Sequence, residues 1–258
     1  MSRPLSLSLR PLRAALLVAV AAVALSACAV NRGSMPSPDF SGMSQAEAQQ
    51  TLAQLGGRYK ANPRDKATII YYAAALRGAG QNDQAVAVLE NAMGIYRNDA
   101  DISVAYAKAL TAQGRFDQAL NVIDATIVPQ QPDWNALSVK GAILDQMGRN
   151  EEARRLYSQA LMIAPQEASL EANLGLSYAM TNELATAETH LRRAVQMQGA
   201  NSRVRQNLAL VVGLQGRFDE ARALYGAELP PDQVEANMAY IRALLTQQNR
   251  WSAIKESR

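Results

Sequence analysis

The sequence predicts an all-α fold, a solenoid of antiparallel helix pairs, and three observations lead to this prediction. Most of the chain repeats with a period of about 34 residues, each repeat carries one turn that is usually marked by glycine, and apolar residues recur at helical spacing on both sides of it. The hydrophobic share of 48% over 258 residues is too high for a disordered chain. A packed, repetitive helical protein is therefore expected.

The period is visible when the chain is written with one repeat to a row. One column holds Gly80, Gly114, Gly148, Asn182 and Gly216, and another, five positions later, holds Ala85, Ala119, Ala153, Ala187 and Ala221. The turn also repeats as GRFDQA at 114–119, GRNEEA at 148–153 and GRFDEA at 216–221. This pattern resembles the tetratricopeptide repeat (TPR), which implies a right-handed superhelical solenoid.

The repeats divide the chain into segments. Before them, Ser44 and Glu47 form a capping-box signature that predicts an N-terminal capping helix within 44–65. A truncated repeat is expected over 236–258, where Asn249-Arg250-Trp251 echoes the turn. The predicted full repeats occupy 66–99, 100–133, 134–167, 168–201 and 202–235, so that the solenoid covers 66–258.

Several local features follow from the repeat. Glycine tolerates left-handed backbone angles after the first helix of a pair, and Asp117 or Asp219 is expected to cap the second helix. In the fifth repeat, Glu228 replaces a small residue just before Pro230 and Pro231, so the second helix should end early there. The apolar residues Leu210, Val211 and Leu214 are expected to pack against the last helices or, alternatively, to form an apolar groove floor.

The amino end reads as a lipoprotein signal peptide over 1–27. Arg3, Arg10 and Arg13 precede an apolar run, 14–25, that is too short for a membrane span of ~20 residues. The run ends LSAC at 25–28, which resembles a bacterial lipobox, and Cys28 is the only cysteine. We expect Cys28 to be lipidated; an ordinary signal peptide with an incidental cysteine is the alternative.

Residues 28–43 carry proline, glycine and serine without a helical period, and they predict a flexible lipid tether. About 15 such residues allow excursions on the order of 20 Å. By resemblance to sorted lipoproteins, Ala29 in place of aspartate implies an outer-membrane, lipid-anchored protein that faces the periplasm.

Charge and composition exclude several functions. The pI is near 9.1, yet removal of the first 27 residues leaves 26 − 3 = 23 basic against 23 acidic residues. A balanced chain lacks the basic excess of a nucleic-acid-binding protein. One cysteine and one histidine exclude the familiar zinc and iron–sulfur clusters. No cofactor, metal, small-molecule substrate or enzymatic activity is expected, and His190, placed on an inter-repeat or solvent-facing side of its helix, is the one residue through which a hydrolase site would pass.

The first helix of each pair lines the concave surface of such solenoids, so its residues between packing positions are expected to meet a polypeptide. Asparagine can bind the main chain of an extended peptide, and arginine can bind a carboxylate with two hydrogen bonds. The alternative is that these positions are polar because they are solvated. The predicted groove residues are Arg77, Lys108, Asn135, Asn173, Arg203, Gln206 and Asn207.

A more specific resemblance rests on the lipobox together with five segments. These read ANPRD at 61–65, ANLGLSYA at 172–179, RVRQNLALVVGLQGR at 203–217, LPP at 229–231 and ANMAYI at 236–241. Together they resemble the TadD family, the tetratricopeptide lipoproteins of tight-adherence (Tad, or Flp) pilus assembly. The resemblance implies a pilotin-like, protein-binding scaffold whose partner is the pilus secretin or another Tad pilus assembly protein. A regulator of a peptidoglycan synthase or hydrolase remains the alternative, because it would use the same anchor and repeats.

Overall fold

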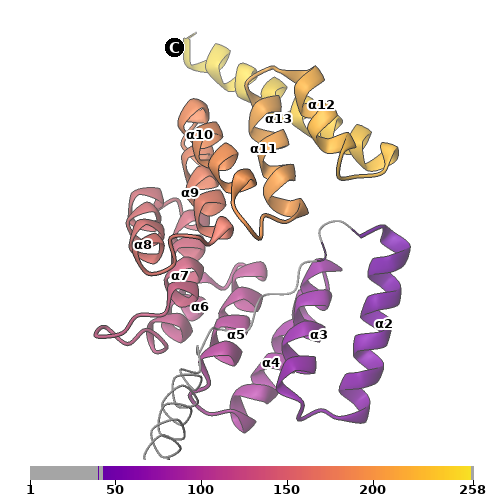
Figure 1. Ribbon diagram of the computed structural model, residues 1–258, viewed down its shortest axis with the longest axis vertical. Coiled ribbons are helices and arrows are strands. Elements are labelled where there is room, and N and C mark those ends of the chain that lie inside the picture. Colours follow the sequence, from indigo (N-terminus) through magenta and orange to yellow (C-terminus); the bar gives the residue numbers. More distant parts are fainter. Residues whose placement is uncertain (1–39, 41–42, 257–258) are drawn as a thin grey trace, which may run out of the picture. The chain divides into compact units, whose positions relative to one another are not determined.

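The computed structural model describes residue 40 and residues 43–256, with side chains up to residue 247. The predicted signal peptide, Cys28 and nearly all of the tether lie outside these residues. The described part contains twelve α-helices and no strand (Figure 1). Their bounds are α2 Gln45–Ala61, α3 Lys66–Gly78, α4 Asn82–Ile95, α5 Ala100–Ala112, α6 Phe116–Asp124, α7 Trp134–Gln146, α8 Asn150–Ile163, α9 Ala168–Met180, α10 Leu184–Gln196, α11 Ser202–Leu214, α12 Phe218–Gly226 and α13 Pro231–Glu256.

The N-terminal capping helix is present as α2, and its capping box is confirmed. The Ser44 side chain accepts a hydrogen bond from the Glu47 backbone amide, and the Glu47 carboxylate accepts one from the Ser44 amide at 2.8 Å. The helix packs on α3, where the rings of Tyr59 and Tyr72 stack at 5.3 Å between centroids. This helix therefore covers the first face of the solenoid.

Five helix pairs follow, α3/α4, α5/α6, α7/α8, α9/α10 and α11/α12, and we call their members A and B. The turn residue between A and B has a positive φ in every pair, including 63° for Asn182, which explains why asparagine replaces glycine in that column. The residue after it donates its amide to a carbonyl five residues earlier, as from Arg115 to Leu110 at 2.9 Å. This Schellman-type bond ends each A helix at the predicted place.

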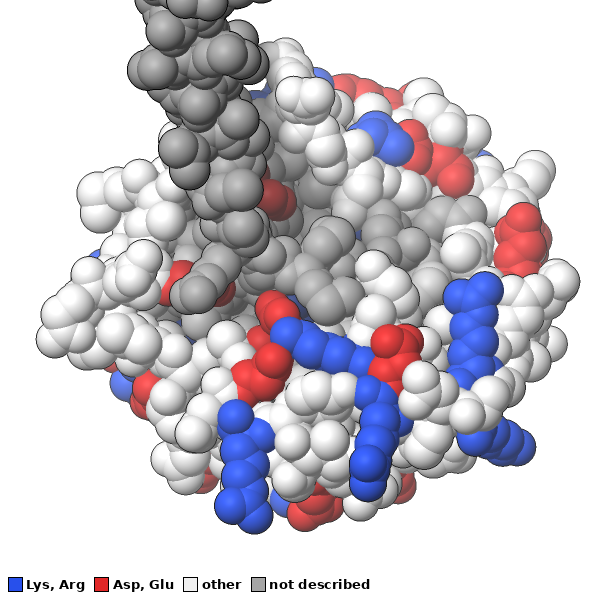
Figure 2. Space-filling model, turned by 60° about the horizontal axis from the view of Figure 1, so that its bottom comes forward, with Lys and Arg blue, Asp and Glu red and all other residues white. Residues whose placement is uncertain are grey.

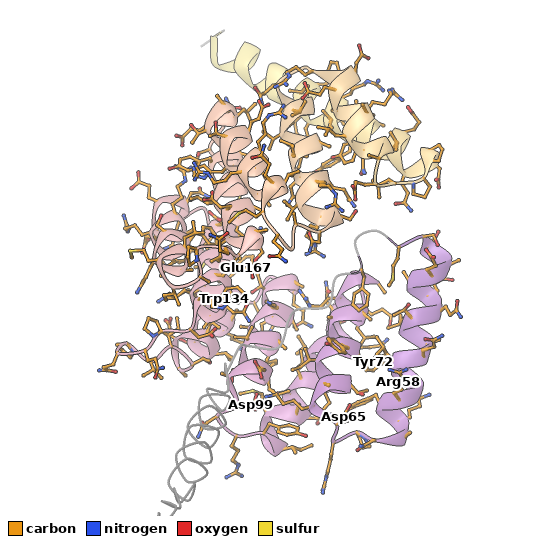
Figure 3. All side chains as sticks on the ribbon, in the orientation of Figure 1. Arg58, Asp65, Tyr72, Asp99, Trp134 and Glu167 are labelled. Carbon is orange, nitrogen blue, oxygen red and sulfur yellow. The ribbon has the colours of Figure 1, made fainter. Side chains whose placement is uncertain are left out.

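The helix caps differ from the expectation. Helices α6 and α12 begin at Phe116 and Phe218 without a side-chain cap, so Asp117 and Asp219 lie inside the first turn and the predicted caps are wrong. The capping side chains instead precede the A helices, where one oxygen accepts a backbone amide of the first turn. They recur once in every repeat, and the first, second and fourth of them are labelled in Figure 3: Asp65, Asp99, Asp133, Glu167 and Asn201.

Small residues let the two helices of a pair approach closely. All five alanines of the predicted column are fully buried. A Cβ added to Gly141 of α7 would lie 2.7 Å from the Tyr157 ring on α8, and one added to Gly175 of α9 would lie 2.9 Å from Leu191 on α10. The large side chain of one helix thus occupies the space that the glycine leaves on the other.

The carboxyl end departs from the repeat. Helix α12 ends at Gly226, as expected from Glu228 and the prolines, and α13 then runs without interruption to Glu256. The turn expected at 249–251 is wrong, because arginine occupies the glycine column at position 250 and nothing there ends the helix. Val211 is fully buried with Met238 and Ile241, and Leu210 and Leu214 pack around this cluster, as the burial interpretation predicted.

The space around two glycines, Gly141 in α7 and Gly57 in α2, predicts opposite effects on stability when each is changed to alanine. Gly141→Ala should destabilise the protein by ~1–3 kcal/mol, because the added methyl overpacks against Tyr157. Gly57→Ala in α2 meets nothing within 4 Å and should stabilise it slightly through helix propensity. Thermal unfolding followed by circular dichroism checks both, and equal melting temperatures for the two variants would refute the packing argument.

Candidate functional site

The A helices form one continuous layer. Each of α3, α5, α7 and α9 contacts the next A helix as well as its own B helix. Each B helix contacts only its own and the following A helix, and none contacts another B helix. Elements on the inside of a curved stack lie closer together than those on the outside, so the A helices line the inner side of the curved helical repeats. The predicted groove residues all belong to A helices.

The amide side chains of this layer lie on three successive A helices. Asn135 is on α7, Asn173 on α9, and Gln206 and Asn207 on α11, and all four are half-buried. Asn173 donates to the Ser138 hydroxyl of α7 at 3.1 Å, which links neighbouring A helices. Gln206 donates to Ser202 within its own helix at 2.9 Å. These groups present amide donors and acceptors along the inner layer.

Three predicted groove cations come together although they lie in the first, second and fifth repeats. Arg77 is near the end of α3, Lys108 is on α5, and Arg203 is in the first turn of α11. Each is close enough to the others for their charges to interact. Arg77 and Lys108 are half-buried, whereas Arg203 is exposed. We call this group the inner cation cluster.

Burial and neighbouring positive charge lower the pKa of two members of this cluster. Burial first, and then the charges of Arg77 and Arg203, lower the pKa of Lys108 to about 8, whereas Asp133 opposes the shift. Burial, and then the charge of Arg203, also lowers the pKa of Arg77. Within the described residues no carboxylate forms a salt bridge with Arg77 or Arg203. The cluster therefore holds positive charge in a partly desolvated place.

His190 has a structural environment that the sequence did not suggest. Its Nδ1 lies 2.7 Å from the carboxylate of buried Glu171, and its ring stacks on Tyr178 with centroids 5.4 Å apart. Both partners are on α9, the A helix of the same repeat. The expected inter-repeat or solvent-facing position is therefore wrong. The spacing of residues within one helix does not predict this contact, because Glu171 and Tyr178 lie 19 and 12 positions before His190 on another helix.

A second buried polar group, the carboxylate of Asp145, was also not predicted from the sequence. It is 5% exposed and accepts hydrogen bonds from Asn150 at 2.8 Å, Tyr157 at 3.0 Å and Ser177 at 2.7 Å. These donors come from α8 and α9, so one carboxylate at the end of α7 joins three helices. Because the carboxylate is buried and bonds side chains of two neighbouring helices, it holds these helices together.

The charged surface outside the cluster is mixed. On the face that Figure 2 shows, basic and acidic side chains lie next to one another and much of the remaining surface is uncharged. Among the ion pairs of the described residues, Lys66 contacts Asp99 and Asp101 at 2.7 and 2.6 Å. No helix in the described part of the chain is long and apolar enough to cross a membrane. Among the same residues, no group of three or more histidine, cysteine, aspartate or glutamate side chains could hold a metal ion.

Comparison with known proteins identifies the repeat. Three family profiles described as tetratricopeptide repeat match residues 76–143, 139–203 and 203–227. No curated protein matches the sequence. Among solved structures, a thermophilic TPR protein of Thermus thermophilus is similar with a TM-score of 0.61 and 21% identity, over 69% of this chain and 100% of that one.

A second similar structure is human IFIT1, solved as a dimer with m7Gppp-AAAA. It has a TM-score of 0.56 and 15% identity, over 71% of this chain and 46% of that one. The present chain therefore spans less than half of that protein. At these identities the similarity concerns the fold.

The lowered pKa of Lys108 predicts that its charge costs stability in the free protein. Lys108→Met should raise the melting temperature at pH 7, where the lysine is protonated in both the folded and the unfolded chain. Because the folded pKa is about 8 and the unfolded value is 10.5, the unfolded chain binds more protons between these values. The wild type should therefore gain stability relative to the variant as pH rises across this window.

Melting temperatures of the wild type and Lys108→Met at pH 7 and pH 9.5 check this prediction. The difference between them should narrow at pH 9.5. A variant that is less stable at pH 7, or a difference that does not change with pH, would contradict it. Arg155→Gln, which changes an exposed residue of α8, serves as the control and should show neither effect.

Proposed function

Because the chain is a tetratricopeptide-repeat protein, a fold that typically serves as a protein-interaction scaffold, we propose that it holds a polypeptide partner on its inner A-helix surface. The observation that carries the proposal is the continuous layer of A helices with amide and cationic side chains half-buried along it. Asparagine amides bind peptide main chain, and arginine and lysine bind carboxylates. The interaction is noncovalent, and the protein is a non-enzymatic scaffold.

The proposal includes a place of action, which rests on the sequence. The lipobox at 25–28 makes Cys28 the point of lipid attachment, and Ala29 assigns the protein to the outer membrane, facing the periplasm. Each buried methylene of an acyl chain contributes ~0.8 kcal/mol, so the three chains of a processed lipoprotein provide a lasting anchor. The residues up to Ser44 then connect this anchor to α2.

Within that compartment, the resemblance to TadD lipoproteins supports a pilotin-like role. The partner is then the pilus secretin or another protein of Tad pilus assembly. The scaffold helps this partner to reach the outer membrane or to assemble there. Tethering supports such a role physically, because a short flexible linker raises the effective concentration of a bound partner at the membrane. The repeat alone does not distinguish this role from regulation of a peptidoglycan enzyme.

A variant without the lipid attachment site distinguishes the role of the membrane anchor from the role of the folded repeats. Cys28→Ser should leave the helical circular dichroism spectrum and the melting temperature unchanged, but the protein should leave the outer-membrane fraction and piliation should be lost. Membrane fractionation and electron microscopy of the cells measure these outcomes. Normal pili on cells that carry only the variant would contradict the membrane-tether part of the proposal.

Co-purification from solubilised envelopes tests the identity of the partner. The proposal expects the pilus secretin, or another Tad assembly protein, to be enriched with the wild type and depleted with Arg203→Glu, which reverses a groove charge on an exposed residue. The melting temperature of Arg203→Glu should change little. Enrichment of a peptidoglycan synthase or hydrolase instead would favour the alternative and overturn the pilus assignment.

A further inference from the structure

A polar cavity of about 720 Å³ lies where the turn between α3 and α4 meets the end of α5. Its volume is in the range of ~300–1,000 Å³ that is typical of ligand sites. None of the predicted groove residues lines this cavity, so it is separate from the amides and cations of the inner layer. Most of its lining consists of amide and charged side chains, which are Gln81, Asn82, Asp83, Gln84, Gln113 and Arg115.

The sequence explains why space is left at this place. Asn82 is the first residue of the B helix α4, and its Nδ2 donates to the carbonyl of Ala112, the last residue of the next A helix, at 3.0 Å. Both side chains are short, so they leave space between the helices. At the equivalent positions of the next three repeats, at least one residue of each pair is longer or aromatic: Phe116 and Gln146, Asn150 and Met180, and Leu184 and Leu214.

One atom of the lining lacks a hydrogen-bond partner. Asn82 Oδ1 is buried, and it is the one buried side-chain nitrogen or oxygen in the described part of the chain that has no partner. Nearly all buried polar atoms in proteins are paired with another protein group, with water or with a ligand. Because Asn82 lines the cavity, a hydrogen-bond donor of a molecule bound there is positioned to satisfy this oxygen.

We propose that the cavity binds a neutral, hydroxyl-rich ligand of the sugar class. The charged residues of the lining are Asp83 and Arg115, whose charges cancel, so the lining favours neither an anion nor a cation. A hydroxyl group donates and accepts at a single atom. It can therefore donate to Asn82 Oδ1 or to the Asp83 carboxylate and also accept from Arg115 or from a glutamine amide.

The polar groups of the cavity are held in place before a ligand binds. Gln113 Nε2 donates to Asp83 Oδ1 at 2.7 Å, and Arg115 Nη1 donates to Gln113 Oε1 at 3.1 Å. This chain of planar groups joins α4 to the residues that follow α5. A carboxylate accepts several hydrogen bonds and a guanidinium donates five, so Asp83 and Arg115 have capacity for the neighbouring hydroxyls of a sugar ring. Groups that are already ordered lose less entropy on binding.

A sugar fits this lining better than a peptide segment does. An extended peptide presents its amides at regular intervals along its length and places side chains in pockets between them. Here the donors and acceptors surround one cavity, and its lining is mainly polar. A ligand with hydroxyl groups on several sides satisfies such an arrangement more completely.

Calorimetric titration of the full chain, solubilised in a detergent without a sugar headgroup, tests the inference. The probes are maltose and N,N′-diacetylchitobiose, with triglycine for comparison. At least one sugar should bind to the wild type. Asn82→Phe introduces the residue type of Phe116, and Ala112→Leu that of Leu214, so each fills the space and should weaken sugar binding by ~10-fold or more.

Charge variants provide a matched pair for the same titration. Arg115→Gln should weaken sugar binding several-fold, because a donor of the lining is lost. Arg149→Gln changes the equivalent residue of the next repeat, which does not line the cavity, and should bind as the wild type does. Melting temperatures of all variants show whether each one is folded. If Asn82→Phe does not fold, Ala112→Leu still tests the filling of the cavity.

Three results would overturn the inference. These are the absence of binding by either sugar, equal sugar affinity of the wild type and a folded cavity-filling variant, and tighter binding of triglycine than of both sugars. The inference goes beyond the proposed function and fails separately from it. Arg203→Glu, which is expected to deplete the polypeptide partner, lies outside the cavity and should bind the sugar as the wild type does.

Discussion

The close approach of the A and B helices within each pair is the contact on which the rest of the structure depends. It requires a small residue where the helices cross, and Gly141 and Gly175 leave room there for Tyr157 and Leu191. The fully buried alanines of the B helices complete the same contact. Because the requirement recurs in every repeat at a constant spacing, each pair repeats the geometry of the one before it. Stacking similar units in this way produces a curved layer of A helices.

The curved layer explains why residues far apart in the chain share one surface. Arg77 and Arg203 are separated by four repeats, yet the curvature brings their charges within interaction range. All three cations lie on A helices, so the site that they form belongs to this layer. Burial, and then the charges of Arg77 and Arg203, lower the pKa of Lys108 to about 8.

The sequence predicted the parts of the fold that repeat. Glycine or asparagine at a left-handed turn and alanine at a helix crossing each have one dominant physical cause, so their columns were sufficient to place the helix pairs. The caps of the A helices recur with the same period, but Asp, Glu and Asn interchange there, which obscures the column. Asp117 and Asp219 belong to a more uniform motif, which led to the prediction that they cap the B helices. The capping side chains precede the A helices instead.

Contacts that occur once were not predictable from the period. The hydrogen bonds of Asp145 and the stacking of His190 on Tyr178 depend on the side-chain geometry of a single repeat. The groove residues were assigned to the A-helix layer by analogy between repeats, and each lies on an A helix. Their grouping into three cations and a row of amides required the curvature between repeats, which the sequence pattern does not specify.

Site-specific photocrosslinking in intact cells tests the central claim most directly, namely that the A-helix layer holds another polypeptide. A photoreactive residue at Asn135 or Asn207, on the inner layer, should give a crosslink to one discrete envelope protein. The same residue at Gln159, exposed on the B helix α8, should give none. Crosslinks from Gln159 with none from the two A-helix positions would contradict the account.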